Sequence, residues 1–159
     1  MAATVIGTIG MVTATSAINS ITTLSSNIFT LVSYLRLTNN VHHTDINKVL
    51  AKTDIEKTIN SLKIIFSEIP EYYHSNISVV DALKNVQEII GSIEDELKEI
   101  QKKTQYNSSL YFLSSWRSYD CRENLDSIDL KATILDKRRD NLFKILEVFK
   151  NCGTVKCQI

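Results

Sequence analysis

Histidine and glutamate at short spacing are the first residues to test for chemistry, because Glu-x-x-His pairs ligate metal in di-iron helical bundles. Glu71 and His74 have this spacing, but such a centre needs a second pair and two further glutamates, and the chain has three histidines in all. The other two, His42 and His43, lie in a polar connector. We expect them to be solvated, and we predict no metal ion and no cofactor.

A run of carboxylates, Glu94-Asp95-Glu96 followed by Glu99, is the second candidate for acid–base chemistry. At helical spacing these side chains are distributed around a helix, so we expect a solvated face and not an acid–base pair. The chain also has no glycine-rich phosphate loop and no nucleophile elbow. These features predict that the protein is not an enzyme and binds no small-molecule substrate.

The cysteines fit neither a disulfide framework nor a zinc motif. There are three of them, Cys121, Cys152 and Cys157, with no second pair at matching spacing. This pattern favours a reducing compartment, which predicts a cytoplasmic location.

Charge and composition restrict the class of protein further. Eighteen basic and eighteen acidic side chains cancel, so there is no basic excess of the kind that nucleic-acid binders carry. One proline and four glycines in 159 residues are few for a turn-rich β fold. We therefore expect long helices in one domain that spans residues 1–159, and no nucleic-acid partner.

The clearest element is a helix predicted over 78–103, with Ser78 as its N-cap and Asp81 as the capping-box partner. Its apolar residues are spaced alternately by four and three positions, which is a heptad seam. The seam consists of Val79, Leu83, Val86, Ile90, Ile93, Leu97 and Ile100.

A second heptad-patterned helix is predicted over 120–151, where Asp120 and Glu123 again have capping-box spacing. One charged residue, Arg139, interrupts its seam. In an antiparallel hairpin Arg139 would lie near Val86, with Glu88 or Asp81 as a partner if it is a polar core residue. The alternative is that its charged end extends to solvent along an aliphatic stem.

Two further helices are predicted between these elements and the N-terminal segment. A short one covers 45–52, and a longer one covers 54–68 and ends before Pro70. Thr53 and Glu56 have the spacing of a capping box at the start of the longer helix.

The connector 104–119 is rich in aromatic residues. Phe112, Trp116 and Arg117 belong to it, and two interpretations stay open. The aromatic side chains cover the end of the bundle, or they form an exposed patch for a partner.

Residues 1–35 contain no Asp, Glu, Lys or Arg. An apolar stripe at helical spacing runs through the second half of this segment: Ile18, Ile21, Leu24, Ile28, Leu31 and Leu35. The segment is either a bundle helix whose outer face carries hydroxyls, or a helix that contacts lipid or an apolar partner. Its frequent Ser and Thr fit neither a secretory signal nor a membrane span.

The run Val5-Ile6-Gly7-Thr8-Ile9-Gly10 and the uncharged segment before Arg36, followed by amphipathic helices, resemble the HeLo and HeLo-like domains. These domains head fungal signalling and cell-death proteins, and the killer domain of mixed-lineage kinase-like protein is related. The resemblance implies a membrane-perturbing or signalling bundle in which the first helix matters most.

The sequence therefore predicts an all-α fold: a single, mostly antiparallel bundle of four long helices plus one short helix. Two hypotheses for its function remain. In the first, the bundle is a membrane-associating or cell-death signalling module that acts through its N-terminal helix, at the periphery of a membrane. In the second, it is a viral or cellular structural adaptor that works by helix–helix contact with a protein partner or with itself.

Overall fold

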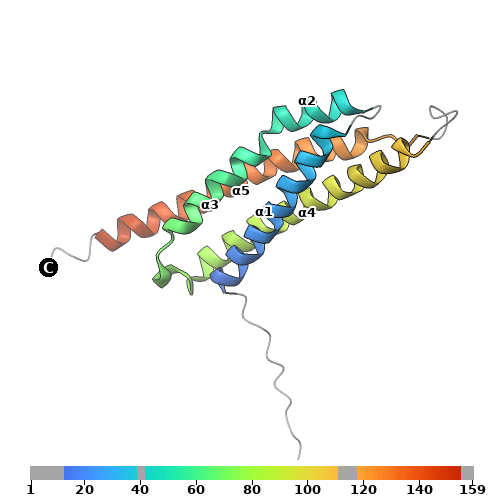
Figure 1. Cartoon of the computed structure of the whole chain (residues 1–159). Helices are drawn as coiled ribbons and strands as arrows, with labels where there is room; N and C mark the ends of the chain where they lie inside the picture. The colour runs from blue at the N-terminus through green and yellow to red at the C-terminus, as the bar shows by residue number, and fades with distance from the viewer. Residues whose placement is uncertain (1–12, 39–41, 111–117, 155–159) are drawn as a thin grey trace, which may run out of the picture.

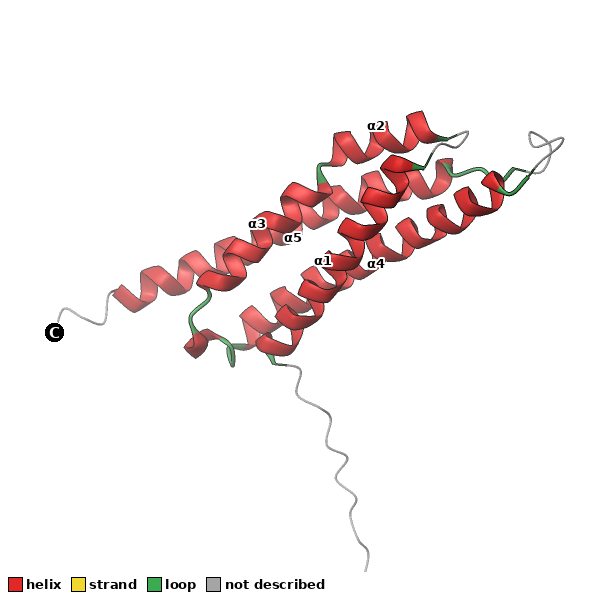
Figure 2. Ribbon diagram, viewed as in Figure 1, coloured by secondary structure: helices red, strands yellow, loops and turns green. Residues whose placement is uncertain are grey.

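A computed structural model describes residues 13–38, 42–110 and 118–154 of the chain. They form five α-helices and one 3₁₀ turn: α1 (Ala14–Leu37), α2 (His43–Thr53), α3 (Ile55–Glu68), η1 (Glu71–Tyr73), α4 (Ile77–Ser108) and α5 (Arg122–Thr154). No strand occurs in these residues (Figure 2). The predicted all-α bundle is confirmed, with α2 as its short helix.

Successive rods of the bundle run in opposite directions, with α2 and α3 following one another as a single bent rod (Figure 1). Helix α1 packs most extensively on α4, and α4 on α5, whereas the α2–α3 rod lies against α1 and α5. The order around the core is therefore α1, α4, α5 and α2–α3. Since α3 and α4 are not neighbours in this order, the connector of residues 69–76 crosses the end of the bundle diagonally.

This order places α1 beside α4 in parallel. Ser20 contacts Gln87 and Asn27 contacts Glu94, so the partners in both pairs are 67 residues apart in sequence. A constant separation is possible only when two helices run in the same direction. Rods that follow one another in sequence are thus antiparallel, as expected. The large contact between α1 and α4, which are not consecutive, is parallel.

The core is built around α4. All seven side chains of its predicted seam are fully buried, and burying a Leu or Ile side chain contributes about 1.5–3 kcal/mol. Ala82 and Ile89, beside the seam, are buried as well. The buried face is wider than a coiled-coil seam because α1 covers one of its sides and α5 the other.

The start of α4 differs from the prediction. Asn76, not Ser78, is the N-cap: its side-chain oxygen accepts hydrogen bonds from the backbone N–H groups of Ser78 and Val79, at 3.0 and 3.3 Å. Asparagine and serine are both favourable N-cap residues. When two of them lie within three positions, the path of the preceding connector determines which one caps the helix. The helix also continues to Ser108, beyond the predicted end at 103.

The capping box predicted at Thr53 and Glu56 is wrong. The Thr53 hydroxyl donates to the carbonyl oxygen of Val49 at 2.9 Å, within α2. Asp54 alone connects α2 and α3, and its φ of 45° lies in the left-handed region, which aspartate adopts more readily than most residues. A single residue in this conformation therefore separates α2 from α3.

Hydrogen bonds join the C-terminal end of α4 to the residues just before α5. Asn107 is buried, and its amide donates to the carbonyl of Tyr119 at 2.9 Å and accepts from the N–H of Tyr119 at 2.8 Å. Phe112, Trp116 and Arg117 lie outside the described residues. The hypotheses about a bundle-end plug or a partner patch at these residues therefore stay predictions.

Candidate functional site

The six stripe residues of α1 lie in the core or against it. Ile21, Ile28, Leu31 and Leu35 are buried, and Ile18 and Leu24 are half-buried and pack on the core. These side chains face α4 and the α2–α3 rod, which are the neighbours of α1. In the folded bundle they close the core, and contact with lipid would require α1 to leave it.

The outer face of α1 consists of uncharged polar residues. Ten exposed residues occupy it before Arg36: Thr13, Thr15, Ser16, Asn19, Thr22, Thr23, Ser26, Asn27, Thr30 and Ser33. Several hydroxyls donate to the carbonyl four residues earlier, as Thr22 does to Ile18 at 2.9 Å and Thr30 does to Ser26 at 3.0 Å. Such bonds satisfy the hydroxyls within the helix itself.

Glu94 contradicts the expectation of a solvated acidic face. The residue is 4% exposed, and its side chain lies between α4 and α1. One carboxylate oxygen accepts a hydrogen bond from the Asn27 amide at 2.8 Å and forms an ion pair with Lys98 at 2.9 Å. Gln87 donates to the Ser20 hydroxyl at 3.0 Å. Gln87 lies seven residues before Glu94, and Ser20 lies seven residues before Asn27. These two polar pairs fix the register of α1 on α4.

Glu96 belongs to a polar cluster on the other side of α4, facing α5. It accepts hydrogen bonds from Lys131 at 2.6 Å, Asn124 at 2.7 Å and Ser127 at 2.8 Å. Burial acts to raise the pKa of Glu96, but these hydrogen bonds and the charge of Lys131 outweigh it, so the pKa is lowered. Glu96 therefore stays ionised as an interhelical anchor.

These two carboxylates do not form an acid–base pair. Glu94 faces α1 and Glu96 faces α5, and each is neutralised by its own lysine. The arrangement joins α4 to α1 on one side and to α5 on the other.

Arg139 forms ion pairs with Asp136 and Asp140, both at 2.9 Å and both on its own helix. Its side chain is partly exposed. The contact with Glu88 that was one alternative for a paired Arg139 belongs to Arg138, which approaches Glu88 to 3.7 Å and also donates to the carbonyl of Asn85.

The histidines connect segments of the chain. His74 contacts the Thr15 hydroxyl through Nδ1 at 3.2 Å, and its carbonyl accepts from the N–H of Ala14 at 3.4 Å. His42 contacts the carbonyl of Tyr119, and His43 contacts the carbonyl of Arg36. Among the residues that the structure describes, no group of three or more His, Cys, Asp or Glu side chains could hold a metal ion.

The feature that sequence analysis missed is a surface groove at one end of the bundle, between α3, η1 and the C-terminal half of α5. Its volume is about 730 Å³. The floor is formed by apolar and aromatic side chains: Ile65, Ile69, Tyr72, Tyr73, Phe143 and Leu146. Three charged and exposed residues also line the groove, and we call them its edge: Glu68, Glu147 and Lys150.

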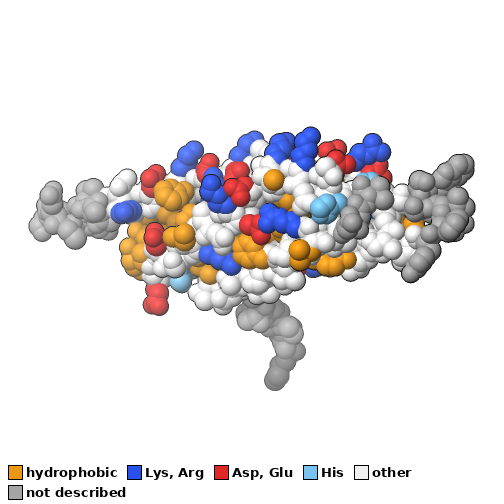
Figure 3. Space-filling model, turned by 45° about the horizontal axis from the view of Figure 1, so that its top comes forward, with side chains coloured by type: hydrophobic (Ala, Val, Ile, Leu, Met, Phe, Trp, Pro, Cys, Tyr) orange, Lys and Arg blue, Asp and Glu red, His pale blue; other side chains and the backbone are white. Residues whose placement is uncertain are grey.

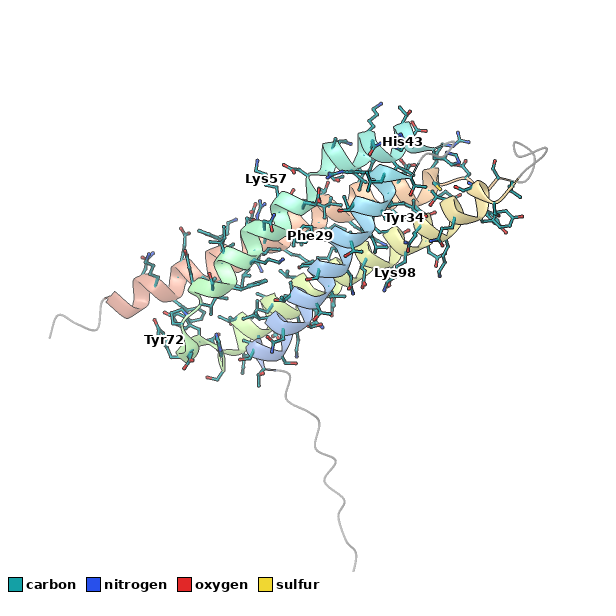
Figure 4. All side chains as sticks on the ribbon, in the orientation of Figure 1. Phe29, Tyr34, His43, Lys57, Tyr72 and Lys98 are labelled. Atoms are coloured by element: carbon teal, nitrogen blue, oxygen red, sulfur yellow. The ribbon has the colours of Figure 1, made fainter. Side chains whose placement is uncertain are left out.

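Two of the aromatic side chains in the groove are open to solvent. Tyr72 is 71% exposed and Phe143 is 50% exposed. Tyr72 lies where η1 connects α3 to α4 (Figure 4), and hydrophobic side chains gather on the same end of the molecule (Figure 3). Beneath them the rings of Tyr73 and Phe149 pack with centroids 5.4 Å apart, which joins η1 to α5.

A partial signal for this groove exists in the sequence. Leu142, three residues after Arg139, continues the heptad seam predicted over 120–151. The aromatic residue Phe143 directly follows it, so Phe143 lies off the stripe that faces the core. Tyr72 lies in a connector next to Pro70, where no periodicity assigns it a face. Neither residue indicates a groove until α3 and α5 are known to be neighbours.

None of the helices in the described part of the chain is long and apolar enough to cross a membrane. Comparison of the chain with protein-family models, with curated proteins and with solved structures finds no match in any of the three.

Proposed function

We propose that this chain is a non-enzymatic adaptor that binds an amphipathic helix of a partner protein in the groove between α3, η1 and α5. The observation that carries the proposal is the apolar floor of the groove, with Tyr72 and Phe143 largely open to solvent. The groove exposes these apolar side chains beside charged ones, and exposed apolar residues rimmed by polar residues occur at interaction sites.

The shape and edge of the groove favour a helix as the occupant. An amphipathic helix places apolar residues at positions i, i+3, i+4 and i+7, which can contact a floor built from two helices and a turn. Charges of both signs, Glu68, Glu147 and Lys150, lie at the edge. They suit the polar flanks of such a helix and would set its orientation.

A peptide display library of amphipathic sequences tests this proposal. We expect the selected peptides to carry apolar residues at helical spacing and to bind Phe143→Glu at least about tenfold more weakly than the original chain. The matched control is Leu130→Glu, which alters an apolar residue of α5 that is 63% exposed and outside the groove. Equal weakening by both substitutions, or none by Phe143→Glu, contradicts the proposal.

A second candidate function, association with a membrane through α1, is supported by the uncharged outer face of this helix. Charged residues cost about 2.5–3.5 kcal/mol each at the centre of a membrane helix, and α1 has none before Arg36. The resemblance to HeLo-like domains points in the same direction. The candidate requires the buried stripe of α1 to exchange its contacts with α4 for contacts with lipid.

Flotation with vesicles of phosphatidylcholine and phosphatidylserine tests the second candidate. Thr22→Lys places a charge on the exposed face of α1 and is expected to abolish flotation without loss of folding. The control Asn85→Lys places the same charge on the exposed face of α4 and is expected to float as the original chain does. Failure of the original chain to float rejects this candidate.

A further inference from the structure

We propose that residues 1–12 of this chain bind in the groove between α3, η1 and α5 and thereby compete with the partner helix. The inference rests on the proposed function, because it assigns the regulation of the same groove. It follows from where the described chain begins, from the composition of residues 1–12 and from the chemistry of the groove.

The N-terminus of α1 is fixed at the end of the bundle that carries the groove. The N–H of Ala14 donates to the carbonyl of His74 at 3.4 Å, and the Thr15 hydroxyl contacts the His74 ring at 3.2 Å. His74 directly follows Tyr73, which lines the groove. A chain of twelve residues spans at most about 40 Å when extended, so residues 1–12 can reach the groove from Thr13.

The chemistry of the segment complements that of the groove. Residues 1–12 have no charged side chain, and their side chains are apolar apart from Thr4 and Thr8. Val5, Ile6 and Ile9 can therefore cover the apolar floor without burying an unpaired charge. The other segment near this end, residues 155–159, is shorter and contains Lys156, so it is the weaker candidate.

Tethering makes even a weak contact effective. A segment joined by a short linker acts at an effective concentration of the order of 1 mM. A free peptide with a Kd of about 100 µM would then occupy its groove roughly nine-tenths of the time when it is part of the chain. A partner helix must displace it, which raises the affinity threshold for binding.

The experiment measures binding of a fluorescent peptide of residues 1–12, extended by two lysines for solubility, by fluorescence anisotropy. The acceptors are the full chain and a variant without residues 1–12, which keeps Thr13 as the N-cap of α1. We expect the peptide to bind the truncated chain at least about tenfold more tightly than the full chain, because the groove of the full chain is already occupied. Phe143→Glu in the truncated chain should abolish this binding, and Leu130→Glu should not.

The outcomes separate this inference from the proposed function. If the library peptides depend on Phe143 but the segment peptide does not bind the truncated chain, the inference is overturned and the adaptor function stands. If only removal of residues 155–159 increases binding, the C-terminal segment is the occupant and the inference is again overturned. If the segment peptide binds but no library peptide depends on Phe143, the groove holds its own segment and the adaptor function fails.

Discussion

The contact between Glu96 and Lys131 gives the sharpest test of how polar groups hold α4 to α5. Substituting Lys131→Met keeps the aliphatic stem and removes the charge. Both side chains are about one-fifth exposed, at 19% and 21%, and the two charged atoms are 2.6 Å apart. Hydrogen bonds to charged groups contribute about 1.5–3 kcal/mol, and exposed ion pairs about 0.2–1 kcal/mol. We therefore expect the substitution to lower the free energy of unfolding by about 1–2 kcal/mol near neutral pH.

Urea unfolding followed by far-UV circular dichroism measures this loss. The matched control is Lys102→Met, which removes an ion pair with Glu99 whose side chains are 69% and 50% exposed. The control should cost less than about 0.5 kcal/mol. A double-mutant cycle with Glu96→Gln isolates the coupling between the two residues. Equal losses for Lys131→Met and Lys102→Met near neutral pH contradict the assignment of Glu96 as a partly buried anchor.

The pH dependence of the same difference provides an independent check. Because the pKa of Glu96 is lower in the folded than in the unfolded chain, its contribution is fully present above the ordinary value of 4.5 and is lost as the pH falls through the folded pKa. The gap in stability between the original chain and Lys131→Met should therefore shrink as the pH falls below 4.5. A gap that stays constant over this range refutes the reasoning, since it then does not come from an ionised Glu96.

Three further predictions concern the core, the caps and a surface carboxyl. Ile90→Ala removes a fully buried side chain at the centre of the α4 seam, and urea unfolding should show a loss of about 2–5 kcal/mol. Asn76→Ala should cost about 1 kcal/mol, whereas Ser78→Ala should cost much less in the same assay, because Asn76 is the N-cap. Hydrogen bonds from the side chain and backbone of Arg122 lower the pKa of Asp120 to about 2, so NMR titration should find that Arg122→Ala raises this pKa towards its usual 3.8.

The α4 seam could be predicted residue by residue from the sequence. A strict alternation of four and three positions leaves only one face for a helix to bury, and Val79, Ile90 and Ile100 lie on it as expected. The caps could not be resolved in the same way. Asn76 and Ser78 compete for one role, and only the path of the connector decides between them.

The burial of Glu94 shows why the polar site could not be predicted. Glu94 directly follows the seam residue Ile93, so it lies about 100° to one side of the stripe, and Glu96 directly precedes Leu97 and lies to the other side. Whether such flanking positions meet solvent or another helix depends on how many neighbours α4 has. The connector of residues 69–76 is compatible with α3 beside α4 or diagonal to it, so its length does not reveal the neighbours.

The groove, too, could be predicted only from knowing which helices are neighbours. Its floor combines residues of α3 and η1 with residues of α5, which is far from both in sequence. Periodicity within one helix assigns Phe143 to an outer face but cannot tell that Tyr72 and Ile69 lie opposite. Only the order of helices around the core brings them together.

The parallel contact of α1 with α4 has a consequence for the synthesis of the chain. Ser20 and Asn27 are translated 67 residues before their partners Gln87 and Glu94. At about 5–20 residues per second, α1 waits roughly 3–13 s on the ribosome for its largest contact surface. During this interval its stripe, which includes Ile21 and Ile28, has no α4 to cover it. We therefore expect the stripe of nascent α1 to stay uncovered by α4, so a pause in translation between α1 and α4 should increase aggregation more than an equal pause after α4.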